Sequence, residues 1–349
     1  MIQDRHSTNK MSINQERNED WKIAIIVIAY QGDDWVPGCI KSLQESTQIK
    51  TLVLLVDNKD NTGLKSKTEG QMTIHCFKTP RPMGFADANN FALMKVPSEV
   101  PYVCFLNQDT ISQPNWLDHV INCLNYNPSL GAVTPVLKNY QGTEWDRDFR
   151  NALMTQPGFN ESWLEDKTRA DATDFKCVED IPATSMVIRT EIIAKTGPFD
   201  PIFGSYYEDY DLCMRIRQLG FQIAICPQSV VFHYSGSISQ SKNARKRRSR
   251  WIIRNRTIHK IRKHKGPRWI LFCKYFIFSG IKQLIRATLG SPSSAPLGIV
   301  IQANFDLIKV LPRLISRAKD HKEWSCFLDG IDWCTFATKP FARHENTAH

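Results

Sequence analysis

One long stretch of the 349-residue sequence lacks acidic residues: from Leu212 to Phe305 it has neither aspartate nor glutamate. The same stretch carries 18 of the 45 lysines and arginines, so the net charge of +10 is concentrated there. A segment of one charge sign favours a polyanionic partner, either an anionic lipid surface or a nucleic acid. Apolar residues are interleaved with the charges and no nucleic-acid-binding motif accompanies them. We therefore expect a membrane surface and no nucleic acid.

Metal-binding cysteine motifs and long apolar runs are missing too. The ten cysteines include no CxxC pair and no Cys/His cluster at zinc-ligand spacing. Most lie in apolar runs, so we expect buried thiols in a reducing compartment. No window of 18 uninterrupted apolar residues suggests a spanning helix, and residues 1–20 lack the apolar core of a signal peptide. We expect residues 1–20 to be a disordered leader and the protein to be cytoplasmic, peripheral on the inner face of the cell membrane.

What is present is an alternation of apolar runs and segments that suit helices. Continuous apolar runs at 23–28, 51–56 and 102–106 are typical of buried parallel strands. Their alternation with helices predicts a doubly wound α/β sheet that binds ligands at the C-terminal strand ends. Residues 139–175 lose this regularity, and we expect either an acceptor-site lid or a surface loop with its own small core. Shorter strands are expected at 72–77, 131–137, 180–188, 221–226 and 230–233, and helices at 37–44, 84–95 and 114–126.

Polar residues follow the apolar runs at 23–28, 51–56 and 102–106. Ala29 and Tyr30 follow the first, Asp57 the second, and Asn107 and Asp109 the third. A carboxylate such as Asp57 can accept hydrogen bonds from a base or a ribose, although aspartate is also common in turns. Side chains spaced like Asn107 and Asp109 can hold a divalent cation over a diphosphate. The alternative for that pair is a turn followed by a helix cap.

Three carboxylates crowd together at Glu208, Asp209 and Asp211, just before an expected helix. Helix N-termini stabilise anions, so capping is one explanation. Capping needs only one carboxylate, however, and neighbouring like charges repel. One of the three is therefore a candidate general base that deprotonates a hydroxyl group. His233 ends a later strand, where it could ligate a metal, contact a phosphate or have a structural role.

Together these pieces resemble glycosyltransferase family 2, the inverting GT-A enzymes, over about residues 22–240. Within that family they are most similar to the bacterial rhamnosyltransferase-like members that build O-antigens, capsules and related surface polysaccharides. The resemblance implies a GT-A fold, a Rossmann-like mixed α/β sheet. It is carried by IIVIAY at 25–30, LVDN at 55–58, GFADANN at 84–90, FLNQDT at 105–110, GPFD at 197–200, YYEDYDLC at 206–213 and VFHYSG at 231–236.

The resemblance also implies residue roles. Asp209 would be the catalytic base, Glu208 would orient acceptor or sugar hydroxyls, and Asp211 would be left to cap the helix. The cation would be Mg²⁺ or Mn²⁺. Pro82 and Asp87 depart from the family pattern and bear on base and sugar specificity. The remaining roles are donor binding by Ala29, Tyr30, Asp57, Gly84, Asn89 and Asn107, and metal ligation by Asp109 and His233.

The basic C-terminal part is expected to be a separate unit. We place a GT-A catalytic domain at 21–240 and a basic, amphipathic, membrane-associating helical region at 241–349. Residues 269–281 suit a helix lying in the plane of a membrane, and 295–317 a second amphipathic helix. The resemblance favours dTDP-rhamnose as the donor, with UDP- and GDP-sugars as alternatives, and we expect a lipid-linked or polysaccharide glycan as the acceptor. The alternatives are a non-catalytic glycan or nucleotide-sugar binding protein and a nucleic-acid-binding protein acting through 242–268.

Overall fold

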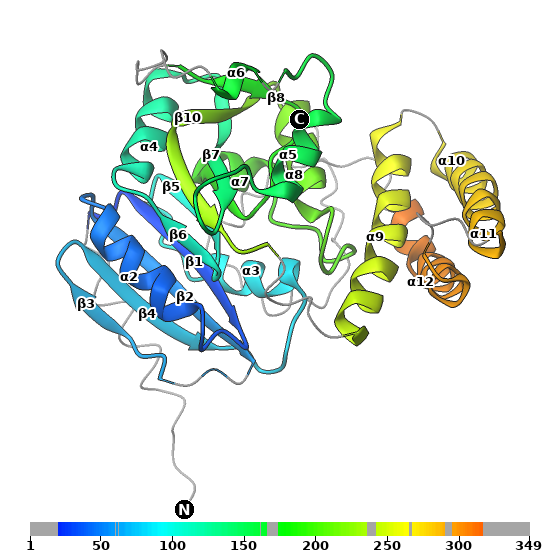
Figure 1. The fold of residues 1–349 in the computed structure, drawn as a ribbon, viewed down its shortest axis with the longest axis horizontal. Coiled ribbons are helices and arrows are strands. Elements are labelled where there is room, and N and C mark those ends of the chain that lie inside the picture. Colours follow the sequence, from blue (N-terminus) through cyan, green and yellow to red (C-terminus); the bar gives the residue numbers. More distant parts are fainter. Residues whose placement is uncertain are drawn as a thin grey trace, which may run out of the picture.

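The computed structural model shows a sheet flanked by helices, beside which the last helices form a separate layer (Figure 1). It describes residues 20–59, 61, 63–160, 162–165, 174–235, 242–264, 267–289 and 295–316. Of the leader expected at 1–20, only Asp20 is among the described residues. Residues 317–349, the end of the expected C-terminal region, also lie outside them.

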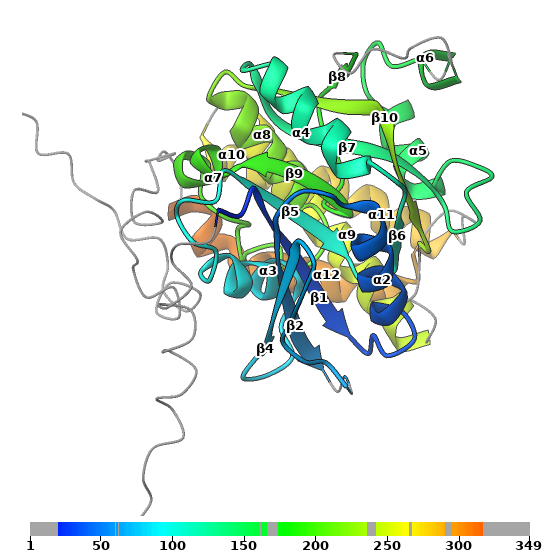
Figure 2. The ribbon, with the colours of Figure 1, turned by 90° about the vertical axis from the view of Figure 1, so that its left-hand side faces the viewer.

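The strands form one mixed sheet in the order β3-β4-β2-β1-β5-β9-β7-β10-β6, with β8 paired to β10 (Figure 2). Strands β4, β2, β1 and β5 run parallel, whereas β9 is antiparallel to both β5 and β7. The strands are β1 (Ile23–Tyr30), β2 (Thr51–Lys59), β3 (Lys67–Glu69), β4 (Met72–Lys78), β5 (Tyr102–Asn107), β6 (Thr110–Ser112), β7 (Leu130–Asn139), β8 (Lys176–Val178), β9 (Ser185–Arg189) and β10 (Gln222–His233).

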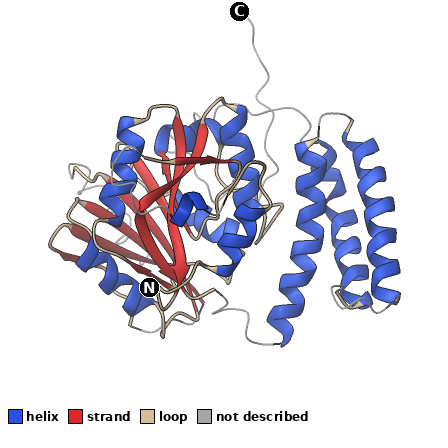
Figure 3. Cartoon of the chain, turned by 45° about the horizontal axis from the view of Figure 1, so that its top comes forward, coloured by secondary structure: helices blue, strands red, loops and turns tan. Residues whose placement is uncertain are grey.

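Helices cover both faces of this sheet and continue beyond it (Figure 3). Within the sheet domain they are α2 (Val36–Ser46), α3 (Phe85–Leu93), α4 (Trp116–Tyr126), α5 (Arg147–Met154), α6 (Ser162–Glu165), α7 (Thr190–Thr196) and α8 (Glu208–Gln218). The C-terminal layer comprises α9 (Lys242–Lys263), α10 (Arg268–Cys273), the π-helix η1 (Lys274–Ser279), α11 (Gly280–Thr288) and α12 (Leu297–Ser316).

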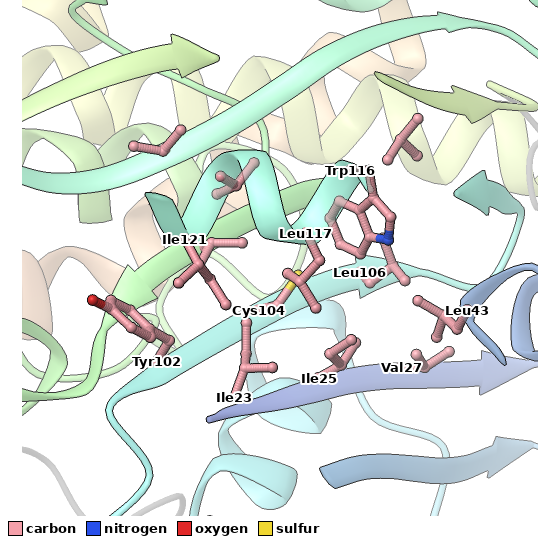
Figure 4. Packing of buried hydrophobic residues seen from close by; sticks show 14 of the residues in the cluster. Ile23, Ile25, Val27, Leu43, Tyr102, Cys104, Leu106, Trp116, Leu117 and Ile121 are labelled. Atoms are coloured by element: carbon pink, nitrogen blue, oxygen red, sulfur yellow. The ribbon is translucent and has the colours of Figure 1, made fainter. Parts of the chain in front are cut away.

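Strand β1 shows why the apolar runs form a buried sheet. Successive side chains point to opposite faces, so Ile23 and Ile25 enter one apolar cluster while Ala24 and Ile26 enter another. The first cluster packs the sheet against α2 and α4. Figure 4 shows Trp116 of α4 among its members. The second packs it against α3, α7 and α8. Because both faces are covered, the strand is apolar throughout.

Three regions differ from the sequence prediction. The strand expected at 180–188 begins only at Ser185. The expected strands 221–226 and 230–233 form one strand, β10, whose pairing with β7 shifts register between Cys226 and Val230. Pro227, which has no N–H to donate, lies within that irregularity. The irregular stretch 139–175 contains α5, whose Phe149 is buried in the first cluster. This helix thus packs on the core of the sheet domain and not on a small core of its own, and the alternative, an acceptor-site lid, stays a prediction.

Helix α9 packs against the sheet domain as well as against the helices that follow it. Ile258 and Ile261 of α9 share an apolar cluster with Phe203 of the sheet domain and Leu307 of α12. This cluster joins α9 to both parts of the chain, and the domain boundary expected at residue 241 stays a prediction. In the part of the chain that the structure describes, every helix falls short of the length and apolar character needed to cross a bilayer.

Candidate active site

The end of β1 is fixed by a side chain that follows β5. Gln108 is buried, accepts a hydrogen bond from the Tyr30 N–H at 2.9 Å and donates one to the Tyr30 carbonyl at 3.1 Å. This pair of bonds mimics a strand pairing and holds the loop after Tyr30 against the loop after β5. The sequence motif suggested Asn107 and Asp109 but gave no role to Gln108, because its partner lies 78 residues earlier.

Asn61 joins the ends of β1 and β2. Its Nδ2 donates to Asp57 Oδ1 at 2.6 Å and to the Ala29 carbonyl at 2.8 Å, and its Oδ1 accepts from the Gly32 N–H at 2.6 Å. The Asp57 side chain stays 16% exposed, with Lys78 Nζ 3.9 Å from its Oδ2. The structure thus brings Ala29, Tyr30 and Asp57 together at one edge of the sheet, as expected, and adds Asn61 to them.

Gly84 and Asn89 have structural contacts of their own. A Cβ atom at Gly84 would lie 2.7 Å from the Gly204 carbonyl oxygen, so glycine allows the start of α3 to approach the loop before α8. Asn89 is buried and donates to the Phe85 carbonyl within α3 at 2.9 Å. These contacts account for both residues structurally, and their part in donor binding stays a prediction.

His233 lies beside the motif that follows β5, because β10 pairs with β6 and places His233 opposite Thr110. His233 Nε2 is 3.5 Å from Asp109 Oδ1 and 3.4 Å from Asn107 Nδ2. Asp109 and His233 are both largely buried. Within the described residues, no group of three or more His, Cys, Asp or Glu side chains is arranged to hold a metal. The two residues expected to ligate the metal therefore meet as a pair.

Asp146 holds the other nitrogen of the His233 ring. Its Oδ2 is 3.1 Å from His233 Nδ1 and also accepts a hydrogen bond from Ser235, while its Oδ1 caps α5 through the Phe149 N–H at 2.8 Å. Burial disfavours the charged imidazolium, but the hydrogen bonds to Asp109 and Asp146 outweigh it and raise the pKa of His233 to about 9. Burial likewise opposes ionisation of Asp146, yet hydrogen bonds from His233 and Ser235 keep its pKa below the usual value.

Asp209 is connected to this motif by two consecutive residues. The Ala183 N–H donates to Asp209 Oδ2 at 3.3 Å, and the next carbonyl, of Thr184, accepts from the Asn107 N–H at 2.9 Å. The Tyr210 N–H donates to Asp209 Oδ1 at 2.9 Å. Burial raises the pKa of Asp209 to about 6, against the opposing effect of these backbone bonds. The carboxyl group is thus connected through Ala183 and Thr184 to the motif that follows β5, and its pKa is about 6.

Glu208 and Asp211 differ from Asp209 in their hydrogen-bond partners and in the pKa of their carboxyl groups. Glu208 is buried, its Oε2 lacks a hydrogen-bond partner within the described residues, and burial together with Asp209 raises its pKa well above the usual value. Asp211 accepts from Arg215 Nε at 2.9 Å and Arg262 at 2.8 Å. Although burial opposes its charge, these two cations keep the pKa of Asp211 below the usual value.

The expectation that Asp211 caps α8 is wrong. The residue in the N-cap position is Tyr207, and it makes no side-chain capping bond. Tyr206 and Tyr207 both adopt left-handed backbone angles, with φ of 70° and 74°. Such angles cost a residue with a Cβ atom about 1–3 kcal/mol each and tend to occur at functional sites. The turn into α8 is thus strained next to the carboxylate cluster.

Comparison with known proteins identifies the family. The pre-mycofactocin glycosyltransferase of Mycobacterium tuberculosis is 24% identical over 185 residues, which make up 52% of this chain and 37% of that protein. This chain thus spans little more than a third of that relative. Rhamnosyltransferase WbbL of Escherichia coli K12 is 22% identical over 230 residues, 61% of this chain and 83% of that protein.

Among solved structures, the mannosyltransferase PcManGT from Pyrobaculum calidifontis, in complex with GDP-Man and Mn²⁺, is similar over 91% of this chain and 90% of its own, at 16% identity and a TM-score of 0.49. Residues 24–196 match the model of glycosyl transferase family 2. This match and the mixed sheet confirm the expected GT-A fold. The chain therefore belongs to glycosyl transferase family 2, through the domain that contains residues 24–196.

Proposed function

We propose that the protein transfers a sugar from a nucleoside-diphosphate sugar to a hydroxyl group of a glycan, with inversion at the anomeric carbon. The observation that carries this proposal is the Asp209 carboxyl group, which two backbone amides hold near the motif after β5. Its pKa of about 6 suits a group that must be ionised at neutral pH and still accept a proton. Asp209 takes the proton of the acceptor hydroxyl, whose oxygen displaces the nucleoside diphosphate in one step.

The donor is proposed to bind at the ends of β1, β2 and β5. Asp57 accepts from the base or the ribose, and the backbone around Ala29 and Tyr30 is fixed by Asn61 and Gln108. Similarity to a rhamnosyltransferase supports dTDP-rhamnose as the first donor to try, followed by UDP- and GDP-sugars. A donor screen that measures nucleoside diphosphate release with crude lipid-linked glycan tests the proposed function. A chain that binds donors without turning over any of them is instead a binding protein.

Asp109 and His233 are proposed to hold Mg²⁺ or Mn²⁺ on the donor diphosphate. A carboxylate oxygen and an imidazole nitrogen face each other at 3.5 Å, and they would fit such an ion once the ring gives up the proton that Asp109 and Asp146 favour. Asp146 orients the ring from its other nitrogen, as second-layer carboxylates commonly do for metal-bound histidines. Mg²⁺ and Mn²⁺ commonly complete their coordination with substrate phosphates and water, so two protein ligands suffice. A bound cation would neutralise charge on the leaving group.

Replacing Asp146 by asparagine is expected to weaken Mn²⁺ affinity by about 10–100-fold, because His233 loses the carboxylate that orients it. Asparagine caps helices as well as aspartate does, so α5 should remain folded. The affinity is measured by electron paramagnetic resonance titration of Mn²⁺ in the presence of UDP. Asp148→Asn is the matched control, since that exposed residue pairs only at the surface with Arg248 and Arg147. Equal Mn²⁺ affinities in all three proteins would remove Asp146 and His233 from the proposed site.

The acceptor is proposed to be lipid-linked, and the C-terminal helices to rest on an anionic membrane. Ile281, Ile285 and Leu289 recur every four residues and are exposed, which makes one apolar stripe along α11 and just beyond. On α12, Ile301 and Phe305 are exposed, whereas the opposite side packs against α9. Lysines and arginines flank these stripes, and each adds about 1 kcal/mol of attraction near an anionic surface. Those exposed on η1, α11 and α12 are Lys274, Lys282, Arg286, Lys309 and Arg313.

Flotation with vesicles of anionic and of purely zwitterionic lipids tests this surface. The protein should float with anionic vesicles at low salt, and Ile281→Glu/Ile285→Glu should abolish flotation because both side chains would enter the interface. Tyr126→Glu is the control, since Tyr126 is 65% exposed on α4, within the sheet domain. Flotation that survives the double substitution would disprove the proposed surface. Salt-sensitive RNA binding without flotation would instead favour nucleic acid as the partner of the basic segment.

A further inference from the structure

A single amide of α9 contacts most of the loop that leads into α8. The Asn255 side chain is fully buried. Its Nδ2 donates to three carbonyl oxygens, those of Phe203, Ser205 and Tyr206, at 2.8, 2.8 and 2.7 Å. The amide has only two protons, so three acceptors share them. One side chain thus satisfies three of the four carbonyls between 203 and 206.

Arg254 fixes Asn255 and extends the same contact. Its Nε donates to Asn255 Oδ1 at 2.8 Å, which orients the amide so that Nδ2 faces the loop. Its guanidinium also donates to the carbonyls of Ile202 and Phe203 at 2.8 and 2.7 Å. The two adjacent residues therefore bind the carbonyls of 202, 203, 205 and 206 from one turn of α9.

The loop that they bind is strained and ends at the carboxylate cluster. Tyr206 and Tyr207 have φ of 70° and 74°, angles that a residue with a Cβ atom adopts only when its surroundings impose them. Tyr207 directly precedes Glu208 and Asp209, the first residues of α8. The direction in which α8 begins, and with it the position of the Asp209 carboxyl group, depends on this backbone conformation.

We propose that Asn255 is a positioning residue for the catalytic base. By holding the carbonyls of residues 203, 205 and 206, it imposes the left-handed turn that places Asp209 at the acceptor hydroxyl. The catalytic consequence rests on the proposed function, whereas the effect on the loop does not. The two can therefore be tested separately on the full-length protein.

Asn255→Leu keeps the side-chain volume and removes the donors, and Asn304→Leu is its control. Asn304 lies on α12 and, among the residues that the structure describes, donates only to the Val300 carbonyl of its own helix. In Asn255→Leu, amide hydrogen exchange of residues 203–209 should accelerate, and kcat should fall about 10²-fold, as expected for a misplaced catalytic group. The donor KM should change little. The acid limb of the kcat–pH profile should move from about 6 towards the ordinary carboxyl value as Asp209 gains contact with water.

A second variant covers the case in which Asn255→Leu fails to fold. Arg254 is less buried than Asn255. Arg254→Met removes the hydrogen bond to Asn255 Oδ1 and should give the same pattern of changes, with a smaller loss of kcat. Unchanged exchange at 203–209 in the folded variants overturns the proposal, and so does a rise in KM with kcat and the acid limb unaltered. If the wild type transfers no sugar from any donor, the proposed function fails, while the exchange measurement still decides whether Asn255 holds the loop.

Discussion

Replacing Asp209 by asparagine should lower kcat by about 10²–10⁴-fold, the usual contribution of a positioned general base. Asparagine has nearly the same shape, and its side-chain oxygen can still accept from the Ala183 or Tyr210 N–H. The loop and the donor site should therefore stay intact, and only the proton acceptor is lost. The rate is measured as nucleoside diphosphate release in the presence of acceptor, and donor binding is measured separately by calorimetry.

The pH dependence and Glu208 provide the controls for this prediction. Wild-type activity should be full well above pH 6, reach half of its maximum near pH 6 and fall further at lower pH, because protonated Asp209 cannot accept a proton. That acid limb should be absent from the residual activity of Asp209→Asn. Burial and the neighbouring Asp209 raise the pKa of Glu208 well above its usual value, which favours the uncharged form that glutamine imitates, so Glu208→Gln should cost far less. If Glu208→Gln removes the activity and Asp209→Asn does not, Glu208 is the base.

The sheet could be predicted because its signal is local. Strands buried on both faces are continuous apolar runs, so 23–28 and 102–106 coincide closely with Ile23–Tyr30 and Tyr102–Asn107. The carboxylates at 208–211 were visible for a similar reason, since three like charges in four residues are unusual wherever they fold. The order of the strands and the insertion of β9 between β5 and β7 were beyond such reasoning, because pairing depends on contacts that a sequence run does not contain.

The missed site residues share one property: each has at least one hydrogen-bond partner that is distant in sequence. Gln108 bonds to a residue 78 positions away, Asn61 to one 32 positions away, and Asp146 to one 87 positions away. Nothing in the sequence around a polar loop residue indicates such a partner. Asp211 shows the converse error, because local reasoning assigned it to a helix cap when its charge is balanced by Arg262, 51 residues later.

Replacing Arg262 by methionine should destabilise the protein by about 3–5 kcal/mol, as is typical when one partner of a buried ion pair is removed. Arg262 is buried and donates to Asp200 at 2.6 Å and to Asp211 at 2.8 Å. Methionine can fill the space but leaves two buried carboxylates without this cation. The free energy of unfolding is measured by urea denaturation, and the midpoint of thermal unfolding should drop by roughly 10 °C.

Lys263→Met is the matched control for that substitution, on the next residue of the same helix. Lys263 pairs with Glu179 at 3.0 Å, but both side chains are more than a third exposed, and such surface pairs contribute about 0–1 kcal/mol. A large difference between the two variants would show that α9 is part of the folded domain, although its composition resembles a solvated basic tail. Equal, small losses of unfolding free energy would instead assign α9 to a separate C-terminal region that begins at residue 241. Because α9 also carries Asn255, the same comparison decides whether the helix is rigid enough to hold the turn before Asp209.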